Sequence, residues 1–133
     1  MKTLLAVLLV VLLGSLAWPA SAPAQAQVTF AGRTITIIVG YPPGGGYDVM
    51  ARLVARHLGR FLPGNPTVIV QNLPGAASVV AANQVFSAAR PDGLTVGAVN
   101  RNLVLGQLVK AAGIRFDMAR FAWIGSPATE TTI

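Results

Sequence analysis

Hydrophobic and polar positions along the chain follow two alternating patterns. Residues 34–39 (TITIIV) are β-branched and almost continuously apolar, which is typical of a strand covered on both faces, as in a parallel sheet. After a glycine-rich break at residues 40–46, apolar residues recur at helical spacing from Asp48 to about Phe61. A proline-glycine pair then ends the periodicity. The pattern predicts a strand, a loop and a helix.

The same order repeats farther along the chain. Residues 67–70 and 94–99 are predicted as the second and third strands, with an alanine-rich helix at residues 78–89 between them. A short helix through Lys110 and a last strand at residues 121–125 complete the prediction. Strands that alternate with helices require crossover connections. We therefore predict an α/β fold, a parallel-sheet lobe of βαβαβ order with right-handed crossovers and helices on both faces.

The first 26 residues are predicted to be a secretory signal peptide. Lys2 precedes an unbroken apolar run at residues 4–13, and Ala24-Gln25-Ala26 offers small residues for cleavage. This run is shorter than the roughly 20 apolar residues that a membrane-spanning helix needs. The chain also has no cysteine that could carry a lipid. We expect a periplasmic protein that is not lipid-anchored, with one α/β lobe at residues 27–133.

Beyond that segment the chain is basic, with nine basic and four acidic side chains. Such a balance could serve nucleic acid, an acidic membrane or an anionic solute. The arginines form no run and do not alternate with aromatic residues, and an exported chain would not meet nucleic acid. We therefore expect no nucleic-acid partner and interpret the face made by Arg52, Arg56 and Arg60 as solvated surface.

The candidate chemistry lies in the loops after the three strands, because open parallel sheets bind ligands beyond the carboxyl ends of their strands. The loops are residues 41–48 (YPPGGGYD), 72–78 (NLPGAAS) and 100–102 (NRN). Glycine and alanine let a ligand approach the backbone closely. The first two loops open helices, whose initial amides lack partners within the helix and favour an anion. This composition predicts a carboxylate or phosphate cradle made of amides.

Catalytic interpretations of the same residues have little support. The glycines are followed by Tyr47-Asp48 rather than by the lysine and hydroxyl of a P-loop, and the dinucleotide pattern fails at Val49. His57 is the only histidine, and it has no carboxylate near it in the sequence. We expect no catalytic residue, no metal and no cofactor, and we interpret Asp48 as the N-cap of its helix.

Two other side chains leave alternatives open. Arg101 is the one cation in a crevice loop, and it could pair with a ligand carboxylate or point into solvent. Trp123, with Phe121, is interpreted as core or interlobe packing in preference to an aromatic shelf for a ligand.

Four stretches carry the most specific motifs of the chain. They are YPPGGGYDVMAR at residues 41–52, NLPGA at 72–76, PDGLT at 91–95 and FDMARFAWIGSP at 116–127. In this order they resemble the Bug-type periplasmic receptors of tripartite tricarboxylate transporters. The resemblance implies a type II periplasmic-binding-protein (Venus-flytrap) fold, of which this chain holds the first lobe and lacks the second. Where the family commonly has glycine after Gly-Ala, this chain has Ala77-Ser78.

The same resemblance implies a receptor that captures an organic di- or tricarboxylate and hands it to membrane permease subunits. Carried over residue by residue, the ligand contacts would come from Tyr41, Gly45, Gly46, Tyr47, Gly75, Ala76, Ala77, Ser78 and Asn100. We expect a monomer without catalytic activity. Two alternatives stay open, a periplasmic signalling or interaction protein that uses the arginine face, and a non-functional truncated receptor fragment.

Overall fold

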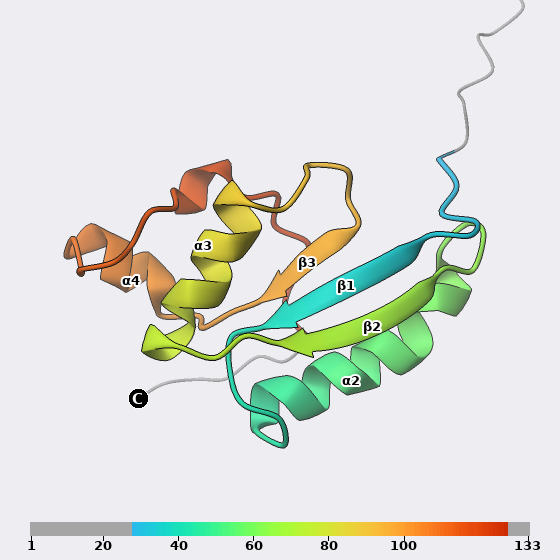
Figure 1. Cartoon of the computed structure of the whole chain (residues 1–133), viewed down its shortest axis with the longest axis horizontal. Coiled ribbons are helices and arrows are strands. Elements are labelled where there is room, and N and C mark those ends of the chain that lie inside the picture. The colour runs from blue at the N-terminus through green and yellow to red at the C-terminus, as the bar shows by residue number, and fades with distance from the viewer. Residues whose placement is uncertain (1–27, 128–133) are drawn as a thin grey trace, which may run out of the picture.

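Strand β1 (Thr34–Val39) lies at the centre of a three-stranded parallel sheet in the computed structural model, which describes residues 28–127 (Figure 1). Its neighbours are β2 (Thr67–Asn72) and β3 (Thr95–Ala98), so the strand order is β2-β1-β3. Both neighbours pair with β1 in parallel, with Thr34 opposite Thr67 and Thr36 opposite Thr95. The three strands and their parallel arrangement are confirmed.

Helices cover both faces of this sheet (Figure 1). Helix α2 (Gly46–Leu58) packs on one face, and α3 (Val79–Ser87) and the short α4 (Leu103–Leu108) lie on the other side. Three 3-10 turns complete the elements: η2 (Gly59–Phe61), η3 (Ala76–Ser78) and η4 (Met118–Arg120). Each of the first two strands is thus followed by a loop and then by a helix on a different face.

The core has two layers because β1 is apolar on both sides. Ile37 and Val39 point toward α2 and pack with Ala51, and Val39 is completely buried. Ile38 points to the opposite face and is also buried. On that side Ala82 of α3 belongs to a second buried cluster, which includes residues of α4 and of the segment after it. The prediction of a strand covered on both faces is confirmed, and this strand anchors the loop that follows it.

The strand predicted at residues 121–125 is wrong. This segment has no ladder partner among residues 28–127, and Phe121 packs its ring at a tilt against Phe86 of α3, with 5.6 Å between centroids. Trp123 is 63% exposed, so it does not occupy the core, and its indole Nε1 donates to the Met118 carbonyl at 3.2 Å. Interlobe packing, the other role expected for Trp123, stays a prediction. Phe121 therefore serves side-chain packing beside α3 instead of a strand.

The helix boundaries differ from the prediction in smaller ways. Helix α2 begins at Gly46, two residues before the predicted start, and the 3-10 turn η2 extends the helical backbone to Phe61. Helix α4 ends at Leu108, and Lys110 has a positive φ of 52°. The predicted signal peptide lies outside the described residues. Within residues 28–127, no helix combines the length and the apolar character needed to span a membrane.

Candidate binding site at the carboxyl edge of the sheet

The loops after the three strands meet at one edge of the sheet. Asn72, the last residue of β2, donates through Nδ2 to the carbonyl of Tyr41, two residues after β1, at 2.9 Å. Asn100, which follows β3, donates through Nδ2 to the Tyr41 hydroxyl at 2.6 Å. Tyr41 therefore contacts both of the other loops, and the predicted convergence is confirmed.

Two tyrosines of the first loop form a stacked pair, and each contacts the third loop. The rings of Tyr41 and Tyr47 lie 4.7 Å apart at an interplanar angle of 19°. The Tyr47 hydroxyl accepts a bond from the amide of Arg101 at 3.4 Å, as the Tyr41 hydroxyl does from Asn100. A phenol that accepts one bond keeps its own hydrogen for donation. Both hydroxyls can therefore donate to an anionic ligand.

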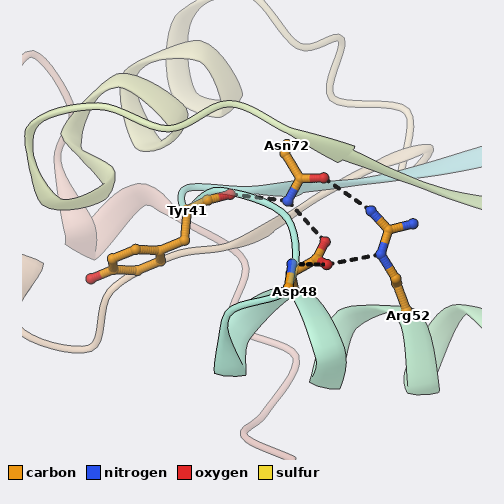
Figure 2. Close-up of polar contacts among 5 residues, drawn as sticks. Tyr41, Asp48, Arg52 and Asn72 are labelled. Atoms are coloured by element: carbon orange, nitrogen blue, oxygen red, sulfur yellow. Dashed lines mark hydrogen bonds and ion pairs between the residues drawn. The ribbon is translucent and has the colours of Figure 1, made fainter.

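Asp48 holds the first loop in place from within α2 (Figure 2). It is only 2% exposed, and its Oδ2 accepts from the Gly44 amide at 2.8 Å and from Arg52 Nε at 2.9 Å. Its Oδ1 accepts from Asn72 Nδ2 at 2.8 Å. The bond from Arg52, followed by those from Gly44 and Asn72, holds the pKa of Asp48 well below its usual range. The carboxylate is therefore ionised at neutral pH.

The N-cap role expected for Asp48 is wrong. Gly45 is the N-cap of α2, and Asp48 is the third helical residue. Its carboxylate reaches back to the Gly44 amide, as the acidic residue of a capping box reaches back. The helix can begin this early because Gly44 has a φ of +87°, which glycine adopts at little cost. One amide of the predicted cradle is thus bound by the protein itself, and Arg52 neutralises the charge that binds it.

The second loop has a left-handed backbone. The φ angles are +151° at Gly75, +45° at Ala76, +50° at Ala77 and +79° at Ser78. A left-handed residue that carries a Cβ costs roughly 1–2 kcal/mol. Ser78 is completely buried, and its Oγ donates to the Gly40 carbonyl at 3.3 Å, which ties this loop to the end of β1. Ala77 and Ser78 therefore adopt backbone angles that suit glycine.

We expect the substitution Ala77→Gly to raise the free energy of unfolding by about 1 kcal/mol, because it relieves the left-handed strain at a small cost in chain entropy. Ala77 is exposed, so its methyl group contributes little packing. Urea unfolding measures the change. The control is Ala88→Gly at an exposed position with a φ of −114°, which should not stabilise the protein. Equal losses in the two variants would contradict the strain argument.

The predicted contact residues lie in three groups, one after each strand. Tyr41, Gly45, Gly46 and Tyr47 surround the start of α2, Gly75 to Ser78 precede α3, and Asn100 follows β3. Gly45 and Gly46 are exposed, as are Ala76 and Ala77. Ser78 differs because it is completely buried. Its side chain ties the second loop to the end of β1.

The sequence interpretation missed Asn72. Its side chain contacts Tyr41, Asp48 and Arg52, and so bonds to three residues of the first loop and α2. A signal was present, because Asn72 is a polar residue two positions after the apolar run of β2, at the edge where the ligand was expected.

The remaining candidates lie elsewhere or are already paired. His57 is near the opposite end of α2 from the first loop, and its Nδ1 lies 2.7 Å from Nη2 of Arg60. Arg52 is half exposed but bonds to Asp48 and Asn72, so the three arginines do not form one uniform solvated face. Within the described part of the chain, no group of three His, Cys, Asp or Glu side chains could hold a metal ion.

Comparisons with known proteins identify relatives, although no family model matches the sequence. The UPF0065 protein of the gbd 5′ region of Cupriavidus necator is 43% identical over 81 residues, which make up 60% of this chain and 24% of that protein. Protein BugT of Bordetella pertussis is 45% identical over 76 residues, 57% of this chain and 22% of BugT. A UPF0065 protein of Bordetella bronchiseptica is 40% identical over 90 residues, 67% of this chain and 26% of that protein.

These matches agree with the resemblance found in the sequence motifs. Each alignment covers more than half of this chain but only about a quarter of the relative. The chain is therefore a homologue of the UPF0065 and Bug proteins over a segment that makes up about a quarter of their length.

Proposed function

We propose that the chain forms the part of a solute receptor that binds an organic carboxylate at the carboxyl edge of its sheet. The observation that carries the proposal is the convergence of three loops on Tyr41, two of which open helices. The first amides of α2 have no partners within the helix, and its dipole favours a negative charge there. At the start of α3 the Val79 amide already donates to the Ala76 carbonyl, so the dipole and the following amides are what α3 can offer. The homology to BugT supports a receptor of the same kind.

The first loop would hold the carboxylate through the amides of Gly45, Gly46 and Tyr47. Gly45 and Gly46 are exposed, and a Cβ placed on Gly46 would have no neighbour within 4 Å. This free space beside the Gly46 amide gives a ligand room to approach the backbone. The hydroxyls of Tyr41 and Tyr47 border the same loop and can donate further bonds.

The second and third loops would complete the cradle. Gly75, Ala76 and Ala77 supply backbone from the second loop, and the buried Ser78 keeps that loop against β1. Asn100 orients Tyr41 through one amide hydrogen and has a second to offer. Such a set of neutral donors recognises the carboxylate group and leaves the rest of the ligand to other contacts.

Binding is favoured over catalysis by the state of the one carboxylate at the site. Asp48 is buried, accepts three hydrogen bonds and has a depressed pKa, so it is a poor general base. Arg52 pairs with it and reduces the repulsion that its charge would exert on an anion. We propose that the site has no catalytic residue and needs no cofactor.

The cellular part of the proposal rests on the sequence. Residues 1–26 have the composition of a secretory signal peptide, which would deliver the protein to the periplasm. Residues 27–133 would correspond to the first of two lobes of a Venus-flytrap receptor. We propose that the receptor passes its carboxylate to permease subunits of a tripartite tricarboxylate transporter.

A thermal-shift panel of citrate, succinate and benzoate tests the ligand class. A ligand present at 100 times its dissociation constant raises the free energy of unfolding by about 2.7 kcal/mol. We expect at least one of the three acids to stabilise the purified chain, with inorganic phosphate and glucose as controls. Stabilisation by phosphate or glucose, with no effect of any acid, would remove carboxylates as the substrate class.

The substitution Gly46→Ala tests the position of the site. Because the added methyl group would enter the free space beside the amide, we expect affinity for the stabilising acid to fall about tenfold. Protein stability should be unchanged or higher by up to about 1 kcal/mol, since alanine is a better helix former than glycine. Isothermal titration calorimetry measures the affinity, and urea unfolding measures the stability. Unchanged affinity would exclude the first loop from the site.

A further inference from the structure

We propose that Asn72 is a positioning residue, which fixes both ends of the first loop and through Tyr41 aligns that loop with the third. Its effect on ligand affinity rests on the proposed function. Its effect on the loops rests on the contacts of the side chain alone, so the two can be tested separately.

The Asn72 amide joins three separate parts of the fold (Figure 2). Its Nδ2 donates to the Tyr41 carbonyl at 2.9 Å and to Asp48 Oδ1 at 2.8 Å, and its Oδ1 accepts from Arg52 Nη2 at 3.1 Å. Both amide hydrogens and one oxygen lone pair are used, all toward residues at least 20 positions away in the sequence. One side chain thus connects β2 to both the first loop and α2.

These contacts hold the first loop from both ends. At the start of the loop Asn72 binds the Tyr41 carbonyl directly. At the other end Asp48, which Asn72 also binds, accepts from the Gly44 amide. The backbone from Tyr41 to Gly44 cannot shift without breaking one of these bonds.

We call these bonds of Asn72 to Tyr41 and Asp48 the Asn72 clamp. The clamp acts on the third loop through the Tyr41 side chain. Because the Tyr41 carbonyl is bound, rotation of its backbone is restrained, and the ring stays stacked on Tyr47. In that position the hydroxyl accepts from Asn100. Loss of Asn72 would release the Tyr41 backbone and weaken a contact that Asn72 itself does not make.

Asparagine is well suited to this position. Aspartate has the same shape but no N–H, so one of its oxygens would face the Tyr41 carbonyl and the Asp48 carboxylate. Alanine removes all three contacts. A matched control exists in Asn83 of α3, which donates to the Gly113 carbonyl at 2.8 Å and accepts from the Arg115 amide at 2.9 Å. Asn83 also joins distant segments, but it contacts none of the three loops through these bonds.

The first arm of the test needs no ligand. Nitrogen-15 NMR spectra of the ligand-free chain report the Asn100 side-chain amide and the exchange rate of the Gly44 amide. We expect Asn72→Ala to shift the Asn100 signal and to speed Gly44 exchange about tenfold, as loss of about one hydrogen bond predicts. Asn83→Ala should change neither. Wild-type behaviour of both probes in Asn72→Ala would overturn the proposal.

The second arm measures affinity for citrate and succinate by titration. We expect Asn72→Ala to weaken binding about tenfold, and Asn83→Ala to bind as the wild type does at an equal folded fraction. Equal affinity of the two variants would overturn the positioning role. If the wild type binds none of citrate, succinate and benzoate, the proposed function fails while the first arm still decides whether Asn72 holds the loops. If Asn72→Ala does not fold, Asn72→Asp replaces it, because its new carboxyl can retain the contact with Arg52 and cannot make the two donations.

Discussion

Replacement of Gly40 by alanine is expected to lower the free energy of unfolding by about 3 kcal/mol, the upper end of the usual cost of overpacking. Gly40 is buried directly after β1. An added Cβ would overlap the side chain of Ser78 and lie 2.9 Å from its Cα. Ser78 is completely buried in a left-handed loop and has no space into which it can retreat. Urea unfolding measures the loss.

A second substitution distinguishes this collision from a general intolerance of β1. The double variant Gly40→Ala/Ser78→Gly removes the overlapping side chain and places glycine at a φ of +79°. We expect it to recover part of the lost stability, although the contact with the Cα at position 78 remains. Gly46→Ala serves as a control with free space around the new methyl group. A single variant as stable as the wild type would contradict the packing described for these two loops.

Acid is expected to destabilise the protein through Asp48. Its pKa in the folded state lies well below the ordinary value of 3.8, because Arg52, Gly44 and Asn72 donate hydrogen bonds to the carboxylate. A depressed carboxyl pKa contributes stability that is fully present above the ordinary value and is lost as the pH falls toward the folded-state pKa. The free energy of unfolding should therefore fall as the pH is lowered below about 3.8.

The substitution Asp48→Asn tests this origin of the acid response. The variant should be less stable than the wild type at neutral pH, because an amide forms weaker bonds with Arg52 and with the Gly44 amide. Its stability should also depend less on pH in the acid range. Asp92→Asn alters an exposed turn and leaves the Asp48 network intact, so it should keep the wild-type slope. If the free energy of unfolding of Asp48→Asn still falls steeply in acid, groups other than Asp48 cause the acid response.

Local patterns were sufficient to predict the parallel sheet. The β-branched run of β1 is apolar at four of its six positions and carries no charge, and burial on both faces is the arrangement that satisfies such a run. The helical spacing that follows it belongs to α2, which packs its apolar residues on β1. Because the loops follow the strands, the edge at which they meet could be predicted as well.

Features that depend on distant residues could not be read from local patterns. Residues 121–125 are apolar enough for a strand, but Phe121 is held by ring contacts with α3 instead of by a ladder. The clamp of Asn72 depends on residues at least 20 positions away. Ser78 could not be predicted to be buried, since only the fold brings it against Gly40. Side chains that connect elements are therefore the part of the site that the structure adds.

The measurement that most directly tests a carboxylate site at this edge is an NMR titration of the nitrogen-15-labelled chain with citrate and succinate. We expect the amide signals of Gly45, Gly46 and Tyr47 to move together with those of Gly75 to Ala77 and of Asn100. The signals of the opposite end of α2, near His57, should stay in place. Signals that stay unchanged with these two acids and with benzoate, or that move only outside these three loops, would contradict a carboxylate site at this edge.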